Sequence, residues 1–187
     1  MGKKNSKVKL PEDTKAFLKR CTNFSDKELK KWYQTFSKVC ANDRMTIEQF
    51  QKIYAYFFME GDSSQFATHV FRTFDKNGDG TIDFKEFMCG LSITMHGGKD
   101  EKLIWAFNMT DIDNSGSITK DELGAMIQSI YELMGRSDFE ESNVPDPAKL
   151  ASHLFEKLDK DSDGDVTLQE FISAAEDDSA ILSLFNN

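Results

Sequence analysis

Three twelve-residue segments of the chain carry oxygen-bearing side chains at matching positions. They are residues 75–86, 111–122 and 159–170, and each has such side chains at positions 1, 3, 5 and 9, glycine at position 6 and glutamate at position 12. Calcium is a hard cation that takes roughly six to eight oxygen ligands. A glutamate can supply two of them, which suits calcium better than the smaller magnesium. The pattern therefore predicts three calcium sites.

The spacing is that of the EF-hand loop, in which position 7 contributes its backbone carbonyl. The predicted ligands are Asp75, Asn77, Asp79, Thr81 and Glu86, then Asp111, Asp113, Ser115, Ser117 and Glu122, and finally Asp159, Asp161, Asp163, Asp165 and Glu170. Because carboxylate count raises calcium affinity, we expect the loops at 75–86 and 159–170 to bind more tightly than the one at 111–122.

A degenerate copy of the pattern precedes these three. A large apolar residue follows position 12 of each loop, and for the loop at 75–86 it is Phe87. One repeat length earlier the chain has Phe50, so a further loop is expected to end at residue 49 and to span residues 38–49. We number the loops 1 to 4 along the chain. Loop 1 has Lys38 at position 1, Cys40 at position 3, Asp43 in place of glycine and Gln49 at position 12. The ammonium of Lys38 and the amide of Gln49 cannot replace the carboxylates that the other loops have at positions 1 and 12. We therefore expect loop 1 to bind no calcium and to serve as a structural partner of loop 2.

Helices must hold these loops, and the flanking sequences predict them. Apolar residues recur at intervals of three and four on both sides of each loop, as in Phe66, Val70 and Phe74 before loop 2. We predict an all-α fold of four EF-hands in two lobes, loop 1 pairing with loop 2 and loop 3 with loop 4. The aliphatic residues at position 8 should form a short two-stranded contact in each pair: Met45, Ile82, Ile118 and Val166.

The same periodicity predicts the division of the chain. We expect a basic N-terminal arm at 1–22, an N-terminal lobe at 23–95, a linker at 96–99 and a C-terminal lobe at 100–187 that ends in a short helix. The longer interval between loops 3 and 4 predicts an exposed acidic loop at 135–147, which holds two of the three prolines.

Charge and composition restrict the function further. The chain has 187 residues and a net charge of −9, but residues 1–20 contain seven Lys and Arg against two acidic residues. An acidic body argues against nucleic acid, and a basic end favours an acidic lipid surface, with a solvated disordered tail as the alternative. Three cysteines without metal-ligand spacing indicate a reducing cytosol. No nucleophile–base pair or phosphate-binding glycine loop is present, so we expect no enzyme.

The N-terminus carries a lipidation signal. Met1 and Gly2 followed by Ser6 fit the N-myristoylation pattern, with the acyl chain on Gly2. One myristoyl chain binds membranes with only about 10⁴ M⁻¹, so stable anchoring needs a second signal. Each lysine near an anionic leaflet adds roughly 1 kcal/mol. The lysines at 3–9 provide that second signal.

The helices expected around loop 1 are unusually aromatic. For Phe36, Phe50 and Phe57 we favour a core position, but two short helices cannot bury every aromatic ring that they carry. We expect the surplus to form a groove for an amphipathic helix or the acyl chain. The residues assigned to this groove are Trp32, Tyr33, Phe36, Ile53, Tyr54, Phe57, Phe58 and Leu91. Cys40, in a loop expected to be exposed, is a candidate for oxidation.

Over nearly its whole length the chain resembles the neuronal calcium sensors, the family of recoverin, hippocalcin, visinin-like proteins and frequenin. The resemblance rests on Met1-Gly2 with Ser6, Phe24-Ser25, Trp32-Tyr33, Phe50 to Tyr54, Phe71 to Phe87, Glu101 to Phe107 and Leu168 to Phe171. The intact loop 4 favours the hippocalcin and visinin-like branch. The chain departs from the family's pattern at residues 40–43, at Thr110 and at 142–147.

The resemblance implies a silent loop 1 and a myristoyl group that is buried without calcium and extruded with it. We therefore expect a cytoplasmic calcium sensor, monomeric or weakly dimeric, that becomes peripheral on the membrane when calcium binds. Its expected partners are anionic lipids and an amphipathic helix of a target such as a kinase, cyclase or channel. The alternatives are a constitutive EF-hand regulatory subunit of an enzyme, of calcineurin-B type, and a plain calcium buffer.

Overall fold

The structure is a computed structural model that describes residues 9–59, 61–135 and 146–177. Its helices are α1 (Glu12–Cys21), α2 (Asp26–Val39), α3 (Ile47–Phe57), α4 (Ser64–Phe74), α5 (Phe84–His96), α6 (Lys99–Thr110), α7 (Lys120–Met134), α9 (Pro147–Leu158) and α10 (Leu168–Asp177). Its strands are β1 (Arg44–Met45), β2 (Ile82–Asp83), β3 (Ser117–Thr119) and β4 (Asp165–Thr167). The predicted fold of mostly helical EF-hands is confirmed.

Each loop is followed by a helix whose first turn is capped by loop residues. In loop 3, the Thr119 side chain accepts a hydrogen bond from the backbone of Glu122, and the Glu122 side chain accepts one from the backbone of Thr119. This reciprocal capping box satisfies two N–H groups that a helix start leaves unpaired. Because loop positions 9 and 12 supply the pair, the ligand spacing also fixes where the following helix begins.

The loops pair through two short antiparallel sheets. β1 pairs with β2, with Met45 opposite Ile82, and β3 pairs with β4, with Ile118 opposite Val166. All four of these side chains are buried. The predicted pairing of loop 1 with loop 2 and of loop 3 with loop 4, through the position-8 residues, is therefore confirmed.

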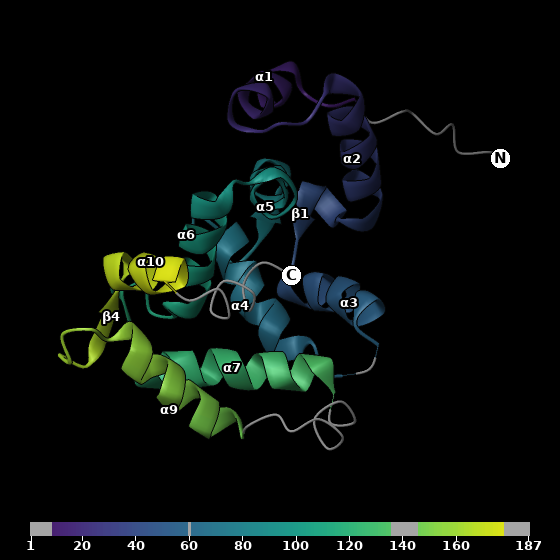
Figure 1. The fold of residues 1–187 in the computed structure, drawn as a ribbon. Helices are drawn as coiled ribbons and strands as arrows, with labels where there is room; N and C mark the ends of the chain where they lie inside the picture. Colours follow the sequence, from purple (N-terminus) through teal and green to yellow (C-terminus); the bar gives the residue numbers. More distant parts are fainter. Residues whose placement is uncertain (1–8, 60, 136–145, 178–187) are drawn as a thin grey trace.

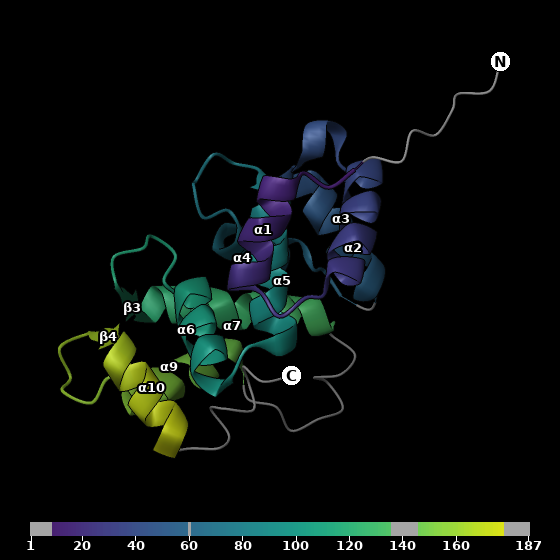
Figure 2. The same cartoon turned by 90° about the horizontal axis from the view of Figure 1, so that it is seen from above.

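Two clusters of buried side chains form the core. One joins the helices of EF-hands 1 and 2 with Leu10 and Leu18 from the N-terminal segment, and it also includes Met109 and Met126. The other joins the helices of EF-hands 3 and 4 around Phe107. Figures 1 and 2 show α1 to α3 at one end of the molecule and α9 and α10 at the other.

Helix α4 connects the two halves, because it contacts α3 and α5 of the N-terminal half and α6 and α7 of the C-terminal half, and Figure 1 shows it between α3 and α7. The Trp105 indole N–H donates to Thr73 Oγ1 at 2.9 Å. The Arg72 guanidinium donates to the carbonyls of Met109, at 3.0 Å, and Asp111, at 3.3 Å. Arg72 thus satisfies carbonyl groups at the end of α6, where loop 3 begins.

A close backbone approach adds to this contact between the halves. The Asp62 N–H donates to the Glu132 carbonyl at 2.8 Å. At Gly61, an added Cβ would lie 2.2 Å from that same carbonyl oxygen, so only glycine fits there without a shift.

The predicted boundaries at 1–22, 23–95, 96–99 and 100–187 stay a prediction. Within the predicted arm, α1 packs against α5 and its Leu18 is fully buried. Gly2, most of the loop predicted at 135–147 and the C-terminal residues 178–187 lie outside the described residues. Among the helices that the structure describes, none is long and apolar enough to cross a membrane.

Two predictions about individual side chains are wrong. Phe57 is 72% exposed rather than in the core, because α3 ends at this residue and its last turn extends beyond the cluster that buries Phe50. Cys40 is buried rather than exposed, because it ends α2 within the N-terminal cluster. That burial raises the pKa of the Cys40 thiol to about 11, which makes it a poor target for oxidation.

Candidate metal centre

Loops 2, 3 and 4 share one backbone arrangement around their first aspartate. In each, the position-6 glycine has a positive φ and its N–H donates to that carboxylate: Gly80 to Asp75 at 2.8 Å, Gly116 to Asp111 at 3.0 Å and Gly164 to Asp159 at 3.1 Å. The positive φ turns the chain sharply, which glycine tolerates without strain. The side chains at positions 1, 3 and 5 therefore gather on the inside of each loop.

The position-12 glutamates join each loop to the helix that follows it. One carboxylate oxygen of Glu122 accepts from the Ile112 N–H at 2.8 Å, and the other accepts from the Thr119 N–H at 2.8 Å. Glu170 makes the same pair of contacts with the N–H groups of Lys160 and Thr167. The loop and the first turn of the helix thus share a single side chain.

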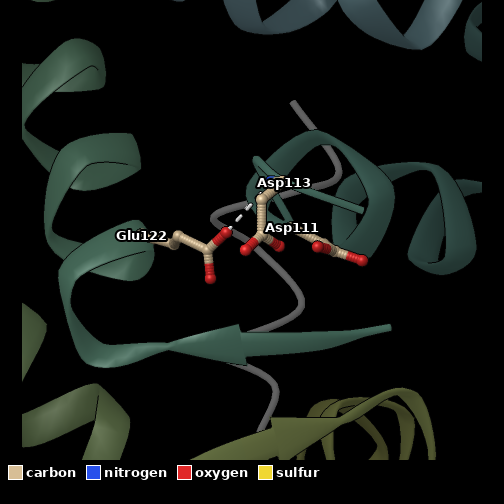
Figure 3. Close-up of side chains that lie close together, drawn as sticks. All are labelled: Asp111, Asp113 and Glu122. Atoms are coloured by element: carbon tan, nitrogen blue, oxygen red, sulfur yellow. Dashed lines mark hydrogen bonds between the residues drawn. The ribbon is translucent and has the colours of Figure 1, made fainter. Parts of the chain in front are cut away.

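Loop 3 brings three carboxylates together. The ligand atoms of Asp111, Asp113 and Glu122 all lie within 4.8 Å of one another, and Figure 3 shows the three side chains converging. Asp111 is only 4% exposed, and its oxygens accept hydrogen bonds from the Ser115 and Gly116 N–H groups. Buried charge requires compensation, and a divalent cation bound between these oxygens would supply it.

Loop 4 contains a matching group formed by Asp159, Asp161 and Glu170, again with ligand atoms within 4.8 Å of one another. The two loops also touch, because the Ser117 hydroxyl donates to Asp165 Oδ1 at 3.0 Å across the β3–β4 pair. The predicted ligands of loops 3 and 4 are thus placed together at one end of the C-terminal half.

Hydrogen bonds keep these carboxylates ionised. Burial opposes the charge on Glu122, but hydrogen bonds from Thr119, Ile112 and Asp113 outweigh it and lower its pKa. The Thr167 hydroxyl and N–H lower the pKa of Glu170 in the same way, and Ser115 lowers that of Asp113. The groups are therefore anionic at neutral pH, as ligands of a hard cation must be.

Loop 2 differs from the other two in its surroundings. Its Asp79, at position 5, pairs with the guanidinium of Arg44, which reaches across from loop 1 and also donates to Thr81 Oγ1 at 3.1 Å. Our sequence reasoning missed Arg44, although it directly precedes Met45, which we predicted to pair with Ile82. The register places Arg44 opposite Asp83 and close to the loop 2 ligands.

Loop 1 uses its polar groups for internal contacts. Asp43 accepts hydrogen bonds from the Tyr33 hydroxyl, at 3.0 Å, and from the Ser37 hydroxyl, at 2.7 Å. The Gln49 side-chain amide donates to the Val39 carbonyl at 3.1 Å, so a donor stands where the other loops have a carboxylate. These contacts support the expectation that loop 1 binds no calcium, which stays a prediction.

The residues assigned to a partner groove are distributed over the core and the surface. Tyr33 and Phe36 are buried, with their rings against Phe84 at 4.9 and 5.5 Å between centroids. Trp32, Ile53, Tyr54 and Leu91 are half-buried, whereas Phe57 and Phe58 are exposed. An open depression of about 270 Å³, with an apolar lining, adjoins the exposed end of α3; it is lined by Val39, Gln49, Lys52, Ile53, Tyr56 and Phe57.

Comparisons with known proteins agree with this geometry. The family model of the EF-hand domain pair matches residues 100–176, and that of the EF hand domain matches residues 67–93. Neuronal calcium sensor 1 of Lymnaea stagnalis is 42% identical over 97% of this chain and 94% of its own length. Human recoverin is 40% identical over 87% of this chain and 82% of its own length.

The lowered pKa values predict acid sensitivity in the calcium-free protein. A carboxylate whose pKa is lower in the folded state stabilises the fold above its unfolded pKa of about 4.3, and this contribution is lost as the pH falls through the folded pKa. In excess chelator, we expect the thermal unfolding temperature to decrease as the pH is lowered beneath about 4.3. The decrease should be smaller in Glu122→Gln and Glu170→Gln, which lack one of these carboxylates. Circular dichroism at several pH values measures this. Glu156→Gln, at an exposed site outside the loops, is the control, and equal pH dependence in all four proteins would contradict the assignment.

Proposed function

Because the chain belongs to the neuronal calcium sensor family, whose members are EF-hand calcium sensors and not enzymes, we propose that it binds three calcium ions and recruits or regulates a membrane-associated target. The proposed ions occupy loops 2, 3 and 4, and loop 1 stays empty. The observation that carries this proposal is the position-12 glutamate, which belongs to the ligand loop and to the first turn of the next helix.

The donor chemistry of the loops supports calcium. Each site offers only oxygens, from carboxylates, amides, hydroxyls and the position-7 carbonyl, which is the set that a hard cation prefers. A calcium ion that draws both oxygens of Glu122 inward would pull on the N–H contacts of Thr119 and so on the start of α7. Ion binding is thereby coupled to the angle between helices, which a sensor requires and a plain buffer does not.

The exposed end of α3 supports a hydrophobic target site. Tyr56 and Phe57 are 75% and 72% exposed and lie beside the apolar depression. Adjacent exposed aromatic rings are unfavourable in water unless they bind a partner. We propose that this surface, enlarged when calcium reorients the helices, receives an amphipathic helix of the target.

For the N-terminus, we propose that Gly2 is myristoylated and that the acyl chain and the basic residues at 3–9 together anchor the calcium-bound protein on anionic membranes. The protein would then be cytoplasmic without calcium and peripheral on the membrane with it. Within the family, the intact ligand set of loop 4 favours the hippocalcin and visinin-like branch.

Calcium stoichiometry tests the three sites. Titration of chelator-treated protein by calorimetry should give three ions, and Glu86→Gln, Glu122→Gln or Glu170→Gln should each remove one, because the amide cannot bind calcium through two oxygens. Gln49→Glu is the matched control: Lys38 still occupies position 1, so the count should stay at three. A count of four in the unaltered protein would contradict the reading of loop 1.

Membrane recruitment tests the sensor against a constitutive subunit or a buffer. Protein coexpressed with an N-myristoyltransferase should sediment with phosphatidylserine vesicles when calcium is present and remain in solution with chelator. Gly2→Ala should lower the bound fraction. Sedimentation that is equal with and without calcium would contradict the switch, and sedimentation unaffected by Gly2→Ala would contradict the acyl anchor.

A further inference from the structure

Two cysteines that are far apart in the sequence meet at the surface. Cys21 is the last residue of α1, and Cys89 lies within α5. Their sulfur atoms are 3.7 Å apart, and the Cys21 thiol also donates to the Phe17 carbonyl at 3.2 Å. Cys21 is exposed and Cys89 is partly buried, whereas Cys40 is buried at the end of α2. Spacing along the chain does not predict this pair, because 68 positions separate the two residues.

We propose that Cys21 and Cys89 are a redox modification site that closes to a disulfide when a hydroperoxide is the oxidant. The sulfur–sulfur bond needs about 2.05 Å, so the two atoms must approach by about 1.7 Å. Cys21 is the last, exposed residue of α1, so its side chain and the end of the helix can adjust to allow this approach.

The reaction consumes two thiols and one hydroperoxide and forms one disulfide, one water and a second water or an alcohol. The Cys21 thiol loses its proton and the thiolate attacks the terminal peroxide oxygen. The O–O bond breaks, the departing oxygen takes up that proton and leaves as water or an alcohol, and Cys21 becomes a sulfenic acid. Cys89 then attacks that sulfur, the S–O bond breaks, and the thiol proton leaves with the hydroxyl as water. Burial and the adjacent Cys21 raise the pKa of Cys89 to about 12, so Cys21 reacts first.

The bond would connect two parts of the proposed sensor. Helix α1 continues the chain from the N-terminal segment, and α5 is the helix that follows loop 2 and carries Glu86 in its first turn. A crosslink between them closes a loop of more than sixty residues, which stabilises the fold by restricting the unfolded chain.

Peptide mapping of the full chain tests this site. After treatment with hydrogen peroxide and alkylation in denaturant, we expect a linked Cys21–Cys89 peptide, alkylated Cys40, and a thermal unfolding midpoint that is several degrees higher and returns on reduction. Cys40→Ser should still form the bond, and Cys21→Ser should not. In Cys89→Ser or Cys89→Ala, the sulfenic acid on Cys21 should persist and react with a dimedone probe. A disulfide that includes Cys40, disulfides only between molecules, or overoxidation of Cys21 with Cys89 unchanged would overturn the proposal.

A separate observation concerns Arg44, which stands at position 7 of loop 1. Its guanidinium pairs with Asp79 and bonds to Thr81, two predicted ligands of loop 2. Among the described residues, the close groups of three carboxylates are in loops 3 and 4, and loop 2 has none. An arginine from the silent loop therefore occupies a carboxylate that the ion would need.

We infer that Arg44 lowers the calcium affinity of loop 2 by competing for Asp79, an inference that rests on the proposed calcium site there. Calcium and the guanidinium must compete for the same Asp79 carboxylate. Arg44 and Asp79 are 45% and 39% exposed, and ion pairs this exposed are weak. The expected effect is therefore modest, about two- to fivefold in the dissociation constant. It acts against the expectation, from carboxylate count, that loop 2 binds more tightly than loop 3.

Site-resolved NMR tests this inference. Because the amides of Gly80, Gly116 and Gly164 each donate to the first aspartate of their loop, they report loops 2, 3 and 4 separately. In Arg44→Gln, calcium should shift Gly80 at a concentration about two- to fivefold lower, while the other two respond as before. Lys76→Gln removes the same charge from loop 2 but no contact with Asp79, so it should leave Gly80 nearly unchanged.

The outcomes separate the two claims. The quantity compared is the calcium concentration at which half of the Gly80 amide shift has occurred. If it is the same in Arg44→Gln and the unaltered protein, or if Lys76→Gln lowers it as much, the role of Arg44 is overturned and the calcium site is left intact. A Gly80 signal that ignores calcium in every protein would overturn the proposed site in loop 2 itself.

Discussion

The structure depends on one side chain used twice, the glutamate at position 12 of loops 2 to 4. As a capping residue it satisfies an N–H group at the start of the next helix, and as a predicted ligand it closes the site. A change in its position must therefore move the helix. Loop 1 keeps the capping role with Gln49, whose amide instead donates to Val39. The fold is preserved where the ligand is lost.

Helix α4 extends this coupling across the molecule. It leads into loop 2, and its Arg72 and Thr73 contact the end and the middle of α6, which leads into loop 3. A rearrangement at loop 2 therefore changes the contacts that α4 makes with α6 beside loop 3, and a rearrangement at loop 3 changes the same contacts from the other side. Helix α3, which carries the exposed aromatic residues at its end, packs against the same α4, so α4 links the proposed target surface to both loops.

Much of this could be predicted from the sequence, because loop ligands, capping pairs and position-8 residues follow local spacing. Met45, Ile82, Ile118 and Val166 were assigned to paired strands on that basis alone. Properties set by tertiary packing were not accessible. The exposure of Phe57 depends on where α3 ends, the burial of Cys40 on how α2 packs, and the meeting of Cys21 with Cys89 on the docking of α1 onto α5.

In the proposed sensor, an ion bound in a loop reorients the helices beside it. Spin labels at Gln65 and Met95, exposed positions on α4 and α5, would measure this around loop 2 in protein whose native cysteines are replaced. We expect saturating calcium to shift the distance distribution between the labels, and Glu86→Gln to abolish the shift. The same distribution with and without calcium would contradict it.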